Sequence, residues 1–411
     1  ACEISEKYRT PVIIRMTTRV CHCKSIVELG SRRNVLNKEY KKDIWQYTTM
    51  PAVSRKLRIK LEERIKGLTE EANNSPFNDV EWNDKSIGII ASGIAYQYAK
   101  EVFGKEASYL RLGFSYPFPM DLIKTFASQV DTLYVIEEVE PYLEEQIRAA
   151  GIECHGKLLL PSIGELSPKI IDEAIRGVRK EILPVQPDKV TNRPPVLCPG
   201  CAHRAIFYEL SRRKDLFISG DIGCYGLGAL PPLNAMDTCI CMGASVSAGH
   251  GVAKAFKEYG VDKHVISVIG DSTFFHSGMT SLLNVVYNKS KTITVILDNR
   301  ITGMTGHQDH PGTGYTAQGE ETQEADIEKI VKALGVNHVK TINPLRLNEL
   351  HEAIDNALEI YEPSVIIARW PCALKKLSAK DKEEFGEYEK KYIVKEELCI
   401  GCKKCIRTGC P

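Results

Sequence analysis

Two polar residues follow short apolar runs in the middle of the chain. Asp271 lies just after the run 264–269, and Asn299 lies just after the run 292–297. Val- and Ile-rich runs of this length are typical of buried parallel strands, and the stretch 279–287 between them has apolar residues at helical spacing. The two polar residues should therefore meet at the sheet edge where open α/β folds bind ligands. A carboxylate and an amide oxygen there suit Mg²⁺, which takes few protein ligands beside phosphate and water oxygens.

The order Gly-Asp-Ser, helix, Asp-Asn resembles the motif that binds thiamine diphosphate (TPP). This resemblance implies that Asp271 and Asn299 are side-chain ligands of Mg²⁺ and that Ile301 offers its carbonyl oxygen, with Gly270 and Ser272 beside the diphosphate. Ser272 replaces the second glycine of the usual motif with another small residue. The alternative is an ordinary strand-to-helix turn in which Asp or Ser caps the helix.

Two further stretches place small residues near the same edge. A strand around 218 runs into a glycine-rich turn, where the main-chain N–H groups of Gly223 and Cys224 can face a diphosphate. Met242 and Gly243 open a Met-Gly-Ala-Ser segment that resembles one lying near the thiazolium in many TPP enzymes. The alternative is that the small residues only allow close helix–strand packing.

Four cysteines close the chain with the spacing C-x₂-C-x₂-C-x₄-C-P. They are Cys399, Cys402, Cys405 and Cys410. Three thiolates at these short gaps suit a [4Fe–4S] cluster, although the last gap is one residue longer than in the bacterial ferredoxin run. A zinc site is the alternative, but zinc usually takes two separated pairs. Because the cysteine before proline ligates the other cluster in two-cluster ferredoxins, Cys410 could belong to a second cluster.

A second set of cysteines is spread along the central region. Cys198 and Cys201 form a C-x₂-C pair, Cys224 lies in the glycine-rich turn, and Cys372 follows an apolar run near residue 369. Together they would give a four-thiolate site close to the cofactor. The alternatives are free buried thiols or a zinc site that uses His203.

Length and composition limit the number of domains and the class of protein. The chain has 411 residues, of which 43% are hydrophobic and 26% charged, enough for two or three ordinary globular domains. A formal net charge of +1 gives no field that would attract nucleic acid or a membrane surface. No apolar run approaches about 18 residues, and no signal peptide is visible. We therefore expect a cytoplasmic protein.

Alternating strand and helix patterns predict an α/β fold. Its main part is an open parallel-sheet TPP-binding domain, preceded by a smaller α/β domain and followed by the start of a ferredoxin-like iron–sulfur module. A helix over 1–7, a strand over 11–14 and a helix over 53–69 are also expected. The predicted divisions are a domain tail (1–24), a linker (25–83), the small α/β domain (84–182), the TPP diphosphate-binding domain (191–375), and a connector with the [4Fe–4S] module (376–411). Both ends look cut, so we expect a fragment of a longer subunit.

The two kinds of motif together indicate one reaction. TPP enzymes decarboxylate 2-oxo acids, and the cofactor carries out the organic step. An iron–sulfur cluster on the same chain accepts electrons singly. Their joint presence predicts oxidative decarboxylation of a 2-oxo acid, with electrons passing to ferredoxin and the acyl group to coenzyme A.

The chain resembles the large subunits of indolepyruvate:ferredoxin oxidoreductases, within the 2-oxoacid:ferredoxin oxidoreductases. The similarity runs through nearly all 411 residues and is carried by the segments 11–22, 198–204, 268–278 and 304–314, together with the terminal cysteines. The His-Gln-x-His-Pro-Gly segment is the most family-specific. Arg300 and Gly303 differ from the small or Ala residues expected in that loop.

The resemblance implies a heteromer with a smaller (beta) subunit and arylpyruvates such as indolepyruvate as substrates. It further implies that 1–24 is the tail of a pyrimidine-binding domain whose activating glutamate lies outside this chain, and that 84–182 is similar to a transketolase C-terminal domain. Some relatives hold a proximal cluster with cysteines arranged like those at 198, 201 and 224.

Three histidines are candidates for catalysis. His276, His307 and His310 could exchange protons or bind the substrate carboxylate, since histidine titrates near pH 7. Each could equally be a hydrogen-bonded structural residue.

Two other functions stay open on the sequence alone. A non-oxidative TPP-dependent decarboxylase or ligase would use Asp271 and Asn299 but would leave the terminal cysteines without a role. A scaffold with structural zinc at both cysteine groups would require the Asp271–Asn299 spacing to be a coincidence. Absence of bound iron would favour the first alternative, and zinc without iron or TPP would favour the second.

Overall fold

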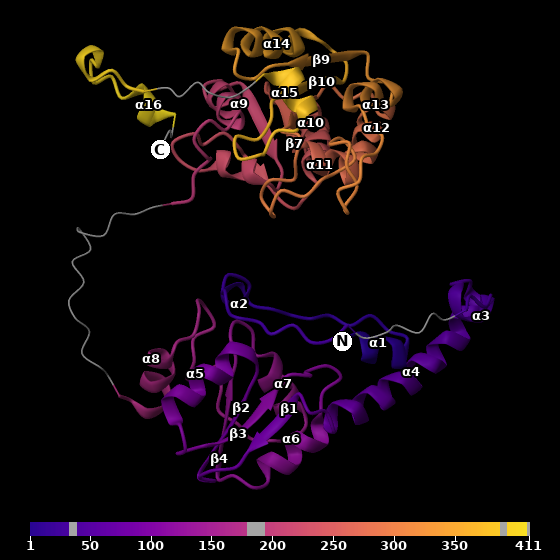
Figure 1. Ribbon diagram of the computed structural model, residues 1–411, viewed down its shortest axis with the longest axis vertical. Helices are drawn as coiled ribbons and strands as arrows, with labels where there is room; N and C mark the ends of the chain where they lie inside the picture. The colour runs from indigo at the N-terminus through magenta and orange to yellow at the C-terminus, as the bar shows by residue number, and fades with distance from the viewer. Residues whose placement is uncertain (33–38, 179–193, 387–392, 409–411) are drawn as a thin grey trace. The chain divides into compact units, whose positions relative to one another are not determined.

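A computed structural model describes residues 1–32, 39–178, 194–386 and 393–408. The chain divides into two compact units, Ala1–Pro187 and Asp188–Pro411, and Figure 1 labels their helices and strands. Each unit is built around its own sheet. No helix in the described ranges is long and apolar enough to cross a membrane.

The first unit contains a four-stranded sheet in the order β1-β3-β2-β4. β2 pairs in parallel with β3 and with β4, whereas β1 is an antiparallel edge strand. Helices cover both faces, with α5 and α8 on one core cluster and α6 and α7 on the other. The bounds are β1 Asn78–Glu81, β2 Ile87–Ala91, α5 Gly93–Phe103, β3 Ser108–Leu112, α6 Met120–Ala127, β4 Thr132–Ile136, α7 Tyr142–Ala149, α8 Pro168–Ile171 and η1 Asp172–Arg176.

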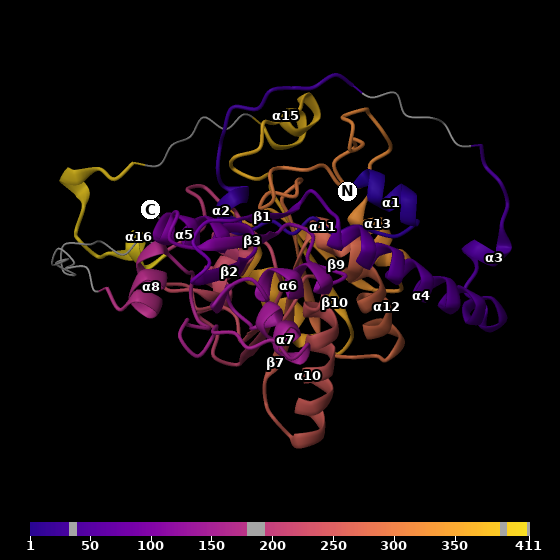
Figure 2. The same ribbon diagram turned by 90° about the horizontal axis from the view of Figure 1, so that it is seen from below.

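Helices dominate the region before β1. α1 (Cys2–Tyr8) and α4 (Pro51–Asn73) confirm the two helices expected there, and Figures 1 and 2 show α4 as one unbroken helix. Two short helices, α2 (Thr18–Cys21) and α3 (Ile44–Tyr47), lie between them. The expected strand at 11–14 is wrong, since those residues form no strand in the described chain.

The predicted linker 25–83 contains ordered structure that belongs to the first unit. The Tyr8 hydroxyl of α1 donates to the Gly67 carbonyl in α4 at 3.1 Å, and β1 pairs with β3. The small α/β domain therefore begins before residue 84. Sequence patterning missed β1 because a four-residue edge strand carries too little alternation to be recognised.

The second unit contains a six-stranded sheet in the order β6-β5-β7-β8-β10-β9. Every neighbouring pair is parallel, so the predicted open parallel sheet is confirmed. The strand bounds are β5 Leu216–Gly220, β6 Thr238–Cys239, β7 His264–Gly270, β8 Ile293–Asp298, β9 His338–Ile342 and β10 Ser364–Arg369.

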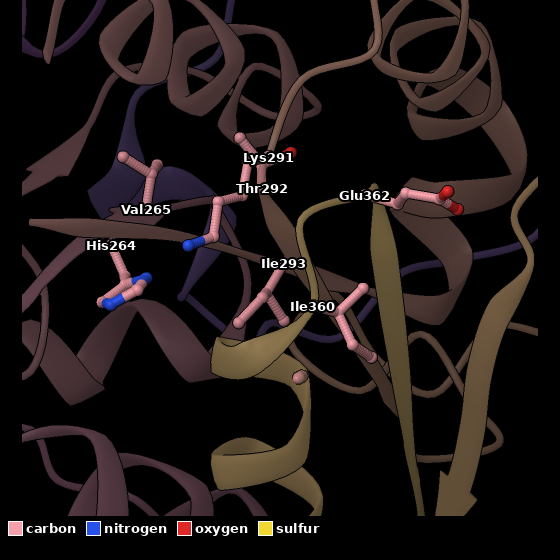
Figure 3. A pocket seen from close by; sticks show the side chains of 8 residues that line it. His264, Val265, Lys291, Thr292, Ile293, Ile360 and Glu362 are labelled. Carbon is pink, nitrogen blue, oxygen red and sulfur yellow. The ribbon is translucent and has the colours of Figure 1, made fainter. Parts of the chain in front are cut away.

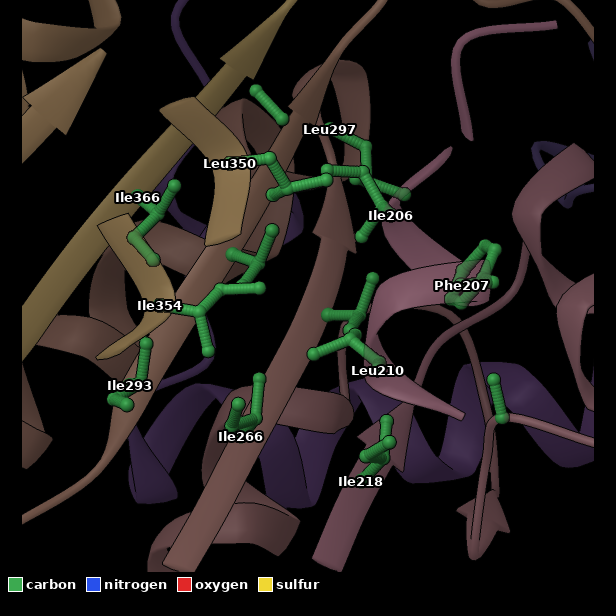
Figure 4. Packing of buried hydrophobic residues seen from close by; sticks show 14 of the residues in the cluster. Ile206, Phe207, Leu210, Ile218, Ile266, Ile293, Leu297, Leu350, Ile354 and Ile366 are labelled. Atoms are coloured by element: carbon green, nitrogen blue, oxygen red, sulfur yellow. The ribbon is translucent and has the colours of Figure 1, made fainter. Parts of the chain in front are cut away.

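Helices cover both faces of this sheet. On one face α9 (His203–Leu210) and α14 (Leu347–Glu359) pack on the strands, and Figure 4 shows Ile206 and Leu210 of α9 and Ile354 of α14 directed at strand residues such as Ile266. On the other face lie α10 (Ser245–Tyr259), α12 (Met279–Tyr287) and α13 (Ile327–Ala333). The result is the three-layer arrangement expected of a parallel sheet, whose strands are apolar on both faces.

The helix after β7 begins irregularly. It starts as α11 (Asp271–Thr273), passes through a π-turn, η4 (Phe274–Gly278), and continues as α12. Such π-turns are frequent at functional sites because they re-aim side chains within a helix. η3 (Cys224–Ala229) is a 3₁₀ turn that follows β5.

The remaining C-terminal elements are short. α15 (Ala379–Phe385) starts with a capping box formed by Ser378 and Asp381, and its Phe385 ring packs edge-on against Trp370 at 5.7 Å between ring centroids. η5 (Glu396–Leu398) and α16 (Lys404–Arg407) follow. The expected ferredoxin-like module is not shown: Cys399, Cys402 and Cys405 are exposed free thiols, and Cys410 lies outside the described residues.

Candidate cofactor site

The two predicted metal ligands lie on one edge of the second sheet. Asp271 follows β7 and Asn299 follows β8, and these strands are parallel neighbours. The main-chain N–H of Arg300 donates to Asp271 Oδ2 at 2.9 Å, and that of Ser272 donates to Asp271 Oδ1 at 2.8 Å. The Asp271 side chain is almost completely buried. The loop that carries Asn299 is therefore held directly against the Asp271 carboxylate, as the sequence predicts.

Asn299 is held in a tight turn. Its Oδ1 accepts the N–H of Ile301 at 3.2 Å, and its Nδ2 lies 3.3 Å from Nε2 of His203. Burial lowers the pKa of His203 to about 4, so this ring is neutral at pH 7 and can accept the amide proton. Ile301 is buried in the same turn. His203 thus links the Cys-Pro-Gly-Cys segment to the second predicted metal ligand.

A second buried aspartate organises the glycine-rich turn. Asp221 is fully buried and accepts main-chain N–H groups from Ile222 at 2.8 Å, Gly243 at 2.7 Å and Ser245 at 3.0 Å. These bonds hold the predicted Met242–Gly243 segment against the turn that contains Gly223 and Cys224. Asp221 is a site residue that was not predicted from the sequence. The sequence feature that could have indicated it is the Gly-Asp pair at the end of β5, which repeats the Gly-Asp pair at the end of β7.

Tyr225 lies beneath two of the predicted cofactor glycines. A Cβ added at Gly223 would lie 2.3 Å from the Tyr225 ring, and one added at Gly270 would lie 2.7 Å from it. The Tyr225 hydroxyl donates to the Ile222 carbonyl at 2.9 Å, and burial raises the pKa of this phenol above its usual range. Only glycine allows the ring to support both turns. Nothing in the sequence pattern marks Tyr225, because its role depends on two distant turns.

Gly243 is constrained in two ways. Its φ is +89°, and an added Cβ would lie 2.0 Å from the Ser277 hydroxyl oxygen of η4. Gly249, two turns further on, brings α10 close to the sheet, since its added Cβ would lie 2.2 Å from Ser267 Oγ. Small residues here therefore do permit close helix–strand packing, which was the alternative interpretation of this segment.

The four central cysteines line one cavity. Cys198, Cys201, Cys224 and Cys372 come from the segment before α9, from η3 and from the loop after β10, and the cavity between them has a volume of about 90 Å³. Burial raises the pKa of Cys201 to about 11, and the other three sulfurs add to this shift. Burial likewise raises the pKa of Cys224. The wall is completed by His203, His307 and Trp370, among others.

These thiols are close but do not form a ready-made metal site. Among the residues that the structure describes, no group of three or more His, Cys, Asp or Glu side chains is arranged to hold a metal ion. The four cysteines surround a mostly apolar space, in which the raised pKa values of Cys201 and Cys224 keep these two thiols protonated. The structure brings together a donor set that the sequence predicts, without showing ligation.

The three candidate histidines have different surroundings. His310 is buried, and its Nε2 lies 3.1 Å from Asp271 Oδ2. His307 is exposed at the cavity, with Nε2 3.8 Å from the Cys372 sulfur. His276 is exposed on the π-turn η4. One histidine therefore contacts a predicted metal ligand, one borders the cysteine cavity, and one faces solvent.

Buried charges surround the predicted metal edge. Asp298 accepts a hydrogen bond from Arg369 Nε at 2.7 Å. Burial, followed by the negative charge of Asp271, raises the pKa of Asp298 to about 6. Arg300, the residue that departs from the family pattern, adopts a left-handed backbone conformation with φ 62° and pairs with Glu324 at 2.8 Å. Glu324 also pairs with Lys380 of α15, so this network joins the metal loop to the C-terminal helix.

A smaller pocket lies at the opposite edge of the sheet. Figure 3 shows it between the amino ends of β7 and β8, where His264, Lys291 and Glu362 border it. Its volume is about 10 Å³, which is about the space of one water molecule. It is therefore too small for a cofactor or an organic substrate.

The fold and this edge define a class of protein. Residues 221–368 match the family described as thiamine pyrophosphate enzyme, C-terminal TPP binding domain. The matched range begins at Asp221 and includes both Asp271 and Asn299. The second unit is thus a TPP-binding domain of a TPP-dependent enzyme.

Relatives over the whole chain identify the family. The indolepyruvate oxidoreductase subunit IorA of Methanothermobacter thermautotrophicus is 39% identical over 440 residues, which cover 100% of this chain and 69% of the relative. The corresponding subunits of Methanothermobacter marburgensis and Pyrococcus horikoshii are 38% and 37% identical, again over 100% of this chain and 69% of each relative. The chain belongs to the indolepyruvate oxidoreductase subunit IorA family, and its assignment as an oxidoreductase subunit is confirmed.

Two solved structures show remote similarity. A 2-oxoglutarate:ferredoxin oxidoreductase from Magnetococcus marinus, with 2-oxoglutarate, coenzyme A and succinyl-CoA bound, has a TM-score of 0.41 and 18% identity over 48% of this chain and 72% of that chain. A putative thiamin diphosphate-dependent enzyme from Mycobacterium smegmatis has a TM-score of 0.34 and 16% identity over 75% of this chain and 64% of that chain.

Proposed function

We propose that this chain, together with a smaller subunit, catalyses the TPP-dependent oxidative decarboxylation of an arylpyruvate, with indolepyruvate as the first candidate. The products are CO₂ and the acyl-CoA, and two electrons leave singly through [4Fe–4S] clusters to ferredoxin. The observation that carries the proposal is that one unit holds both the Asp271–Asn299 edge and the four-cysteine cavity. His203 touches both, because it lines the cavity and contacts Asn299. The cytoplasmic location expected from the sequence stays a prediction.

The residues at the sheet edge fit Mg²⁺ and a diphosphate. Asp271 and Asn299 supply hard oxygen atoms of the kind that Mg²⁺ prefers, and the carbonyl of Ile301 is the third proposed ligand. The close approach of the Tyr225 ring requires glycine at 223 and at 270, in the two turns that are proposed to border the diphosphate. TPP, when bound, supplies the decarboxylation chemistry. Gly270, Ser272, Gly223, Cys224, Met242 and Gly243 are the residues proposed to border it.

The cavity residues fit the ligands of an iron–sulfur cluster. Four thiols converge on one apolar space, which matches the all-cysteine ligation of [4Fe–4S] clusters. The zinc alternative that uses His203 is disfavoured, because Nε2 of that ring already contacts the Asn299 amide. Cluster binding would deprotonate all four thiols, including those of Cys201 and Cys224, whose pKa values are raised. Cys399, Cys402, Cys405 and Cys410 are proposed as ligands of a second electron carrier.

His307 and His276 remain candidates for proton transfer. His307 borders the cavity beside Cys372, and both rings are exposed, so each is free to meet a substrate or the partner subunit. We propose acid–base or carboxylate-binding roles for these two residues.

An anaerobic assay of the assembled enzyme tests the function. We expect ferredoxin reduction that requires indolepyruvate, TPP, Mg²⁺ and coenzyme A, and that is abolished by Asp271→Ala. Release of CO₂ without ferredoxin reduction would favour the non-oxidative alternative. Zinc in place of iron, with no TPP binding, would favour the scaffold. Replacing indolepyruvate by an aliphatic 2-oxo acid tests the substrate class.

A further inference from the structure

His310 is tied to the Asp271 carboxylate from within the protein. Its ring is buried, as is the Asp271 side chain, and its Nε2 lies 3.1 Å from Oδ2 of Asp271. We propose that His310 is a positioning residue that, together with the Arg300 N–H, occupies Oδ2 and leaves Oδ1 of Asp271 for the cation. The inference rests on the proposed function, because it takes Asp271 as a ligand of Mg²⁺.

The hydrogen bonds fix which nitrogen of His310 carries the proton. The main-chain N–H of Gly312 donates to Nδ1 at 3.1 Å, so Nδ1 is an acceptor and carries no hydrogen. In a neutral imidazole the other nitrogen is then the donor. Nε2–H therefore points its hydrogen at Asp271 Oδ2. Both ring nitrogens are engaged inside the protein, which leaves neither to exchange a proton with a substrate.

The hydrogen bond from His310 limits how many lone-pair sites the Asp271 carboxylate has left for a cation. Each carboxylate oxygen offers about two lone-pair sites. Oδ2 accepts both the Arg300 N–H at 2.9 Å and the His310 Nε2–H at 3.1 Å, so its two sites are taken. Oδ1 accepts only the Ser272 N–H at 2.8 Å among the described contacts. One lone-pair site of Oδ1 is left, which favours one-oxygen coordination of a cation.

The surroundings keep the His310 ring in this orientation. The Phe275 ring packs against it, with 5.6 Å between ring centroids. The Thr313 hydroxyl and the Thr313 N–H both donate to the His310 carbonyl at 2.9 Å. A Cβ added at Gly312 would lie 2.8 Å from the Phe275 ring and 3.1 Å from His310 Cε1. The ring therefore has little room to turn away from Asp271.

A matched pair of substitutions separates the two hydrogen bonds of the ring. In His310→Asn, the side-chain oxygen can lie near the position of Nδ1 and accept the Gly312 N–H, but no donor reaches Asp271. In His310→Gln, the longer side chain can place an N–H near the position of Nε2 and donate to Oδ2. The two variants have similar size and polarity, and only the second keeps the bond that the proposal requires.

The measurement is Mn²⁺ affinity in the presence of TPP, followed by the EPR signal of free Mn²⁺ on the purified complex. We expect His310→Asn to weaken Mn²⁺ binding about 10- to 100-fold, the usual loss for a partner of a metal ligand, and His310→Gln to weaken it less than about tenfold. Thermal unfolding without metal and TPP reports the fold of each variant separately.

The outcomes separate this inference from the proposed function. If the unmodified complex binds Mn²⁺ and TPP and His310→Asn binds as tightly, His310 does not position Asp271 and only the inference falls. If His310→Asn does not fold, His310→Gln alone tests the inference. A folded Gln variant that loses Mn²⁺ binding contradicts it, and one that keeps Mn²⁺ binding supports it. If the unmodified complex binds neither Mn²⁺ nor TPP, both the proposed function and the inference are overturned.

Discussion

At the scale of single residues, two Gly-Asp pairs end neighbouring strands, and their aspartates have different roles. Asp221 uses both carboxylate oxygens to accept three main-chain N–H groups, so it holds two turns together. Asp271 also accepts three hydrogen bonds, but one of its donors is a side chain, that of His310. The sequence shows the same pair twice, and the structure shows that the two aspartates have different hydrogen-bond donors.

Gly243 gives a test of the cofactor turn. Gly243→Ala forces a Cβ into contact with Ser277 Oγ at a residue with φ +89°, so we expect a loss of about 1–3 kcal/mol in the free energy of unfolding and weaker TPP binding. Gly251→Ala in α10 is the control, since an added Cβ there meets nothing within 4 Å. It should stabilise by about 0.5–1 kcal/mol. Equal denaturation midpoints for the two variants would contradict the assigned strain.

At the scale of elements, continuous apolar runs were recognised and short edge strands were not. β7 and β8 lie where the Val- and Ile-rich runs place them, because strands buried on both faces need no alternation. β6 has two residues and β1 has four, too few for a pattern. The apolar segment 11–14 forms no strand, since strand formation depends on a partner more than on propensity.

β3 carries a prediction about alkaline pH. Tyr109 is fully buried, its hydroxyl donates to the Gly104 carbonyl at 2.8 Å, and burial raises its pKa from 10.0 to about 12. Above pH 10 the unfolded chain loses this proton while the folded chain keeps it. The folded state should therefore lose stability as the pH rises from 10 towards 12, by up to about 3 kcal/mol.

Tyr109→Phe tests this effect by urea unfolding of the first unit. At about pH 8 the variant should be less stable by about 1 kcal/mol, because the hydrogen bond is lost. At about pH 11 the difference should shrink or reverse, since Phe does not ionise. Tyr116→Phe is the control because Tyr116 is exposed. The idea fails if the pH dependence of Tyr109→Phe matches that of the unmodified chain.

At the scale of the whole molecule, residues from far-apart segments form the cysteine cavity. Cys198 and Cys372 border the same cavity, although all six strands of the second sheet lie between them in the chain. The arrangement arises because the segment before α9, the turn after β5 and the loop after β10 all reach the carboxyl edge of one parallel sheet, where such folds build their sites.

Iron content tests whether this cavity holds a cluster. Cys198→Ser and Cys372→Ser should each lose about four Fe per chain and the corresponding EPR signal after anaerobic reduction with dithionite. Cys154→Ser is the control, because Cys154 is a buried thiol of the first unit. If iron survives both changes and depends only on the terminal cysteines, the cavity holds no cluster and electrons must leave by another route.

The sequence by itself determined the family, the α/β class, and the placement of Asp271 and Asn299 at one sheet edge. The family was recognised by resemblance, whereas the class and the placement follow from apolar periodicity and motif spacing, which are local properties of the chain. It also selected the four cysteines that line the cavity, through a resemblance rather than through geometry. It could not distinguish the roles of His276, His307 and His310, of which the first lies in a helical segment and the other two in one loop.

Only the tertiary structure decided which atoms are engaged. It showed that His310 contacts Asp271 while His276 faces solvent, that Tyr225 supports two glycine turns, and that β1 belongs to the first sheet. The physical reason is that these contacts use main-chain N–H groups and side-chain packing between distant segments. Every residue except proline carries the same N–H donor, so its partner cannot be read from residue type.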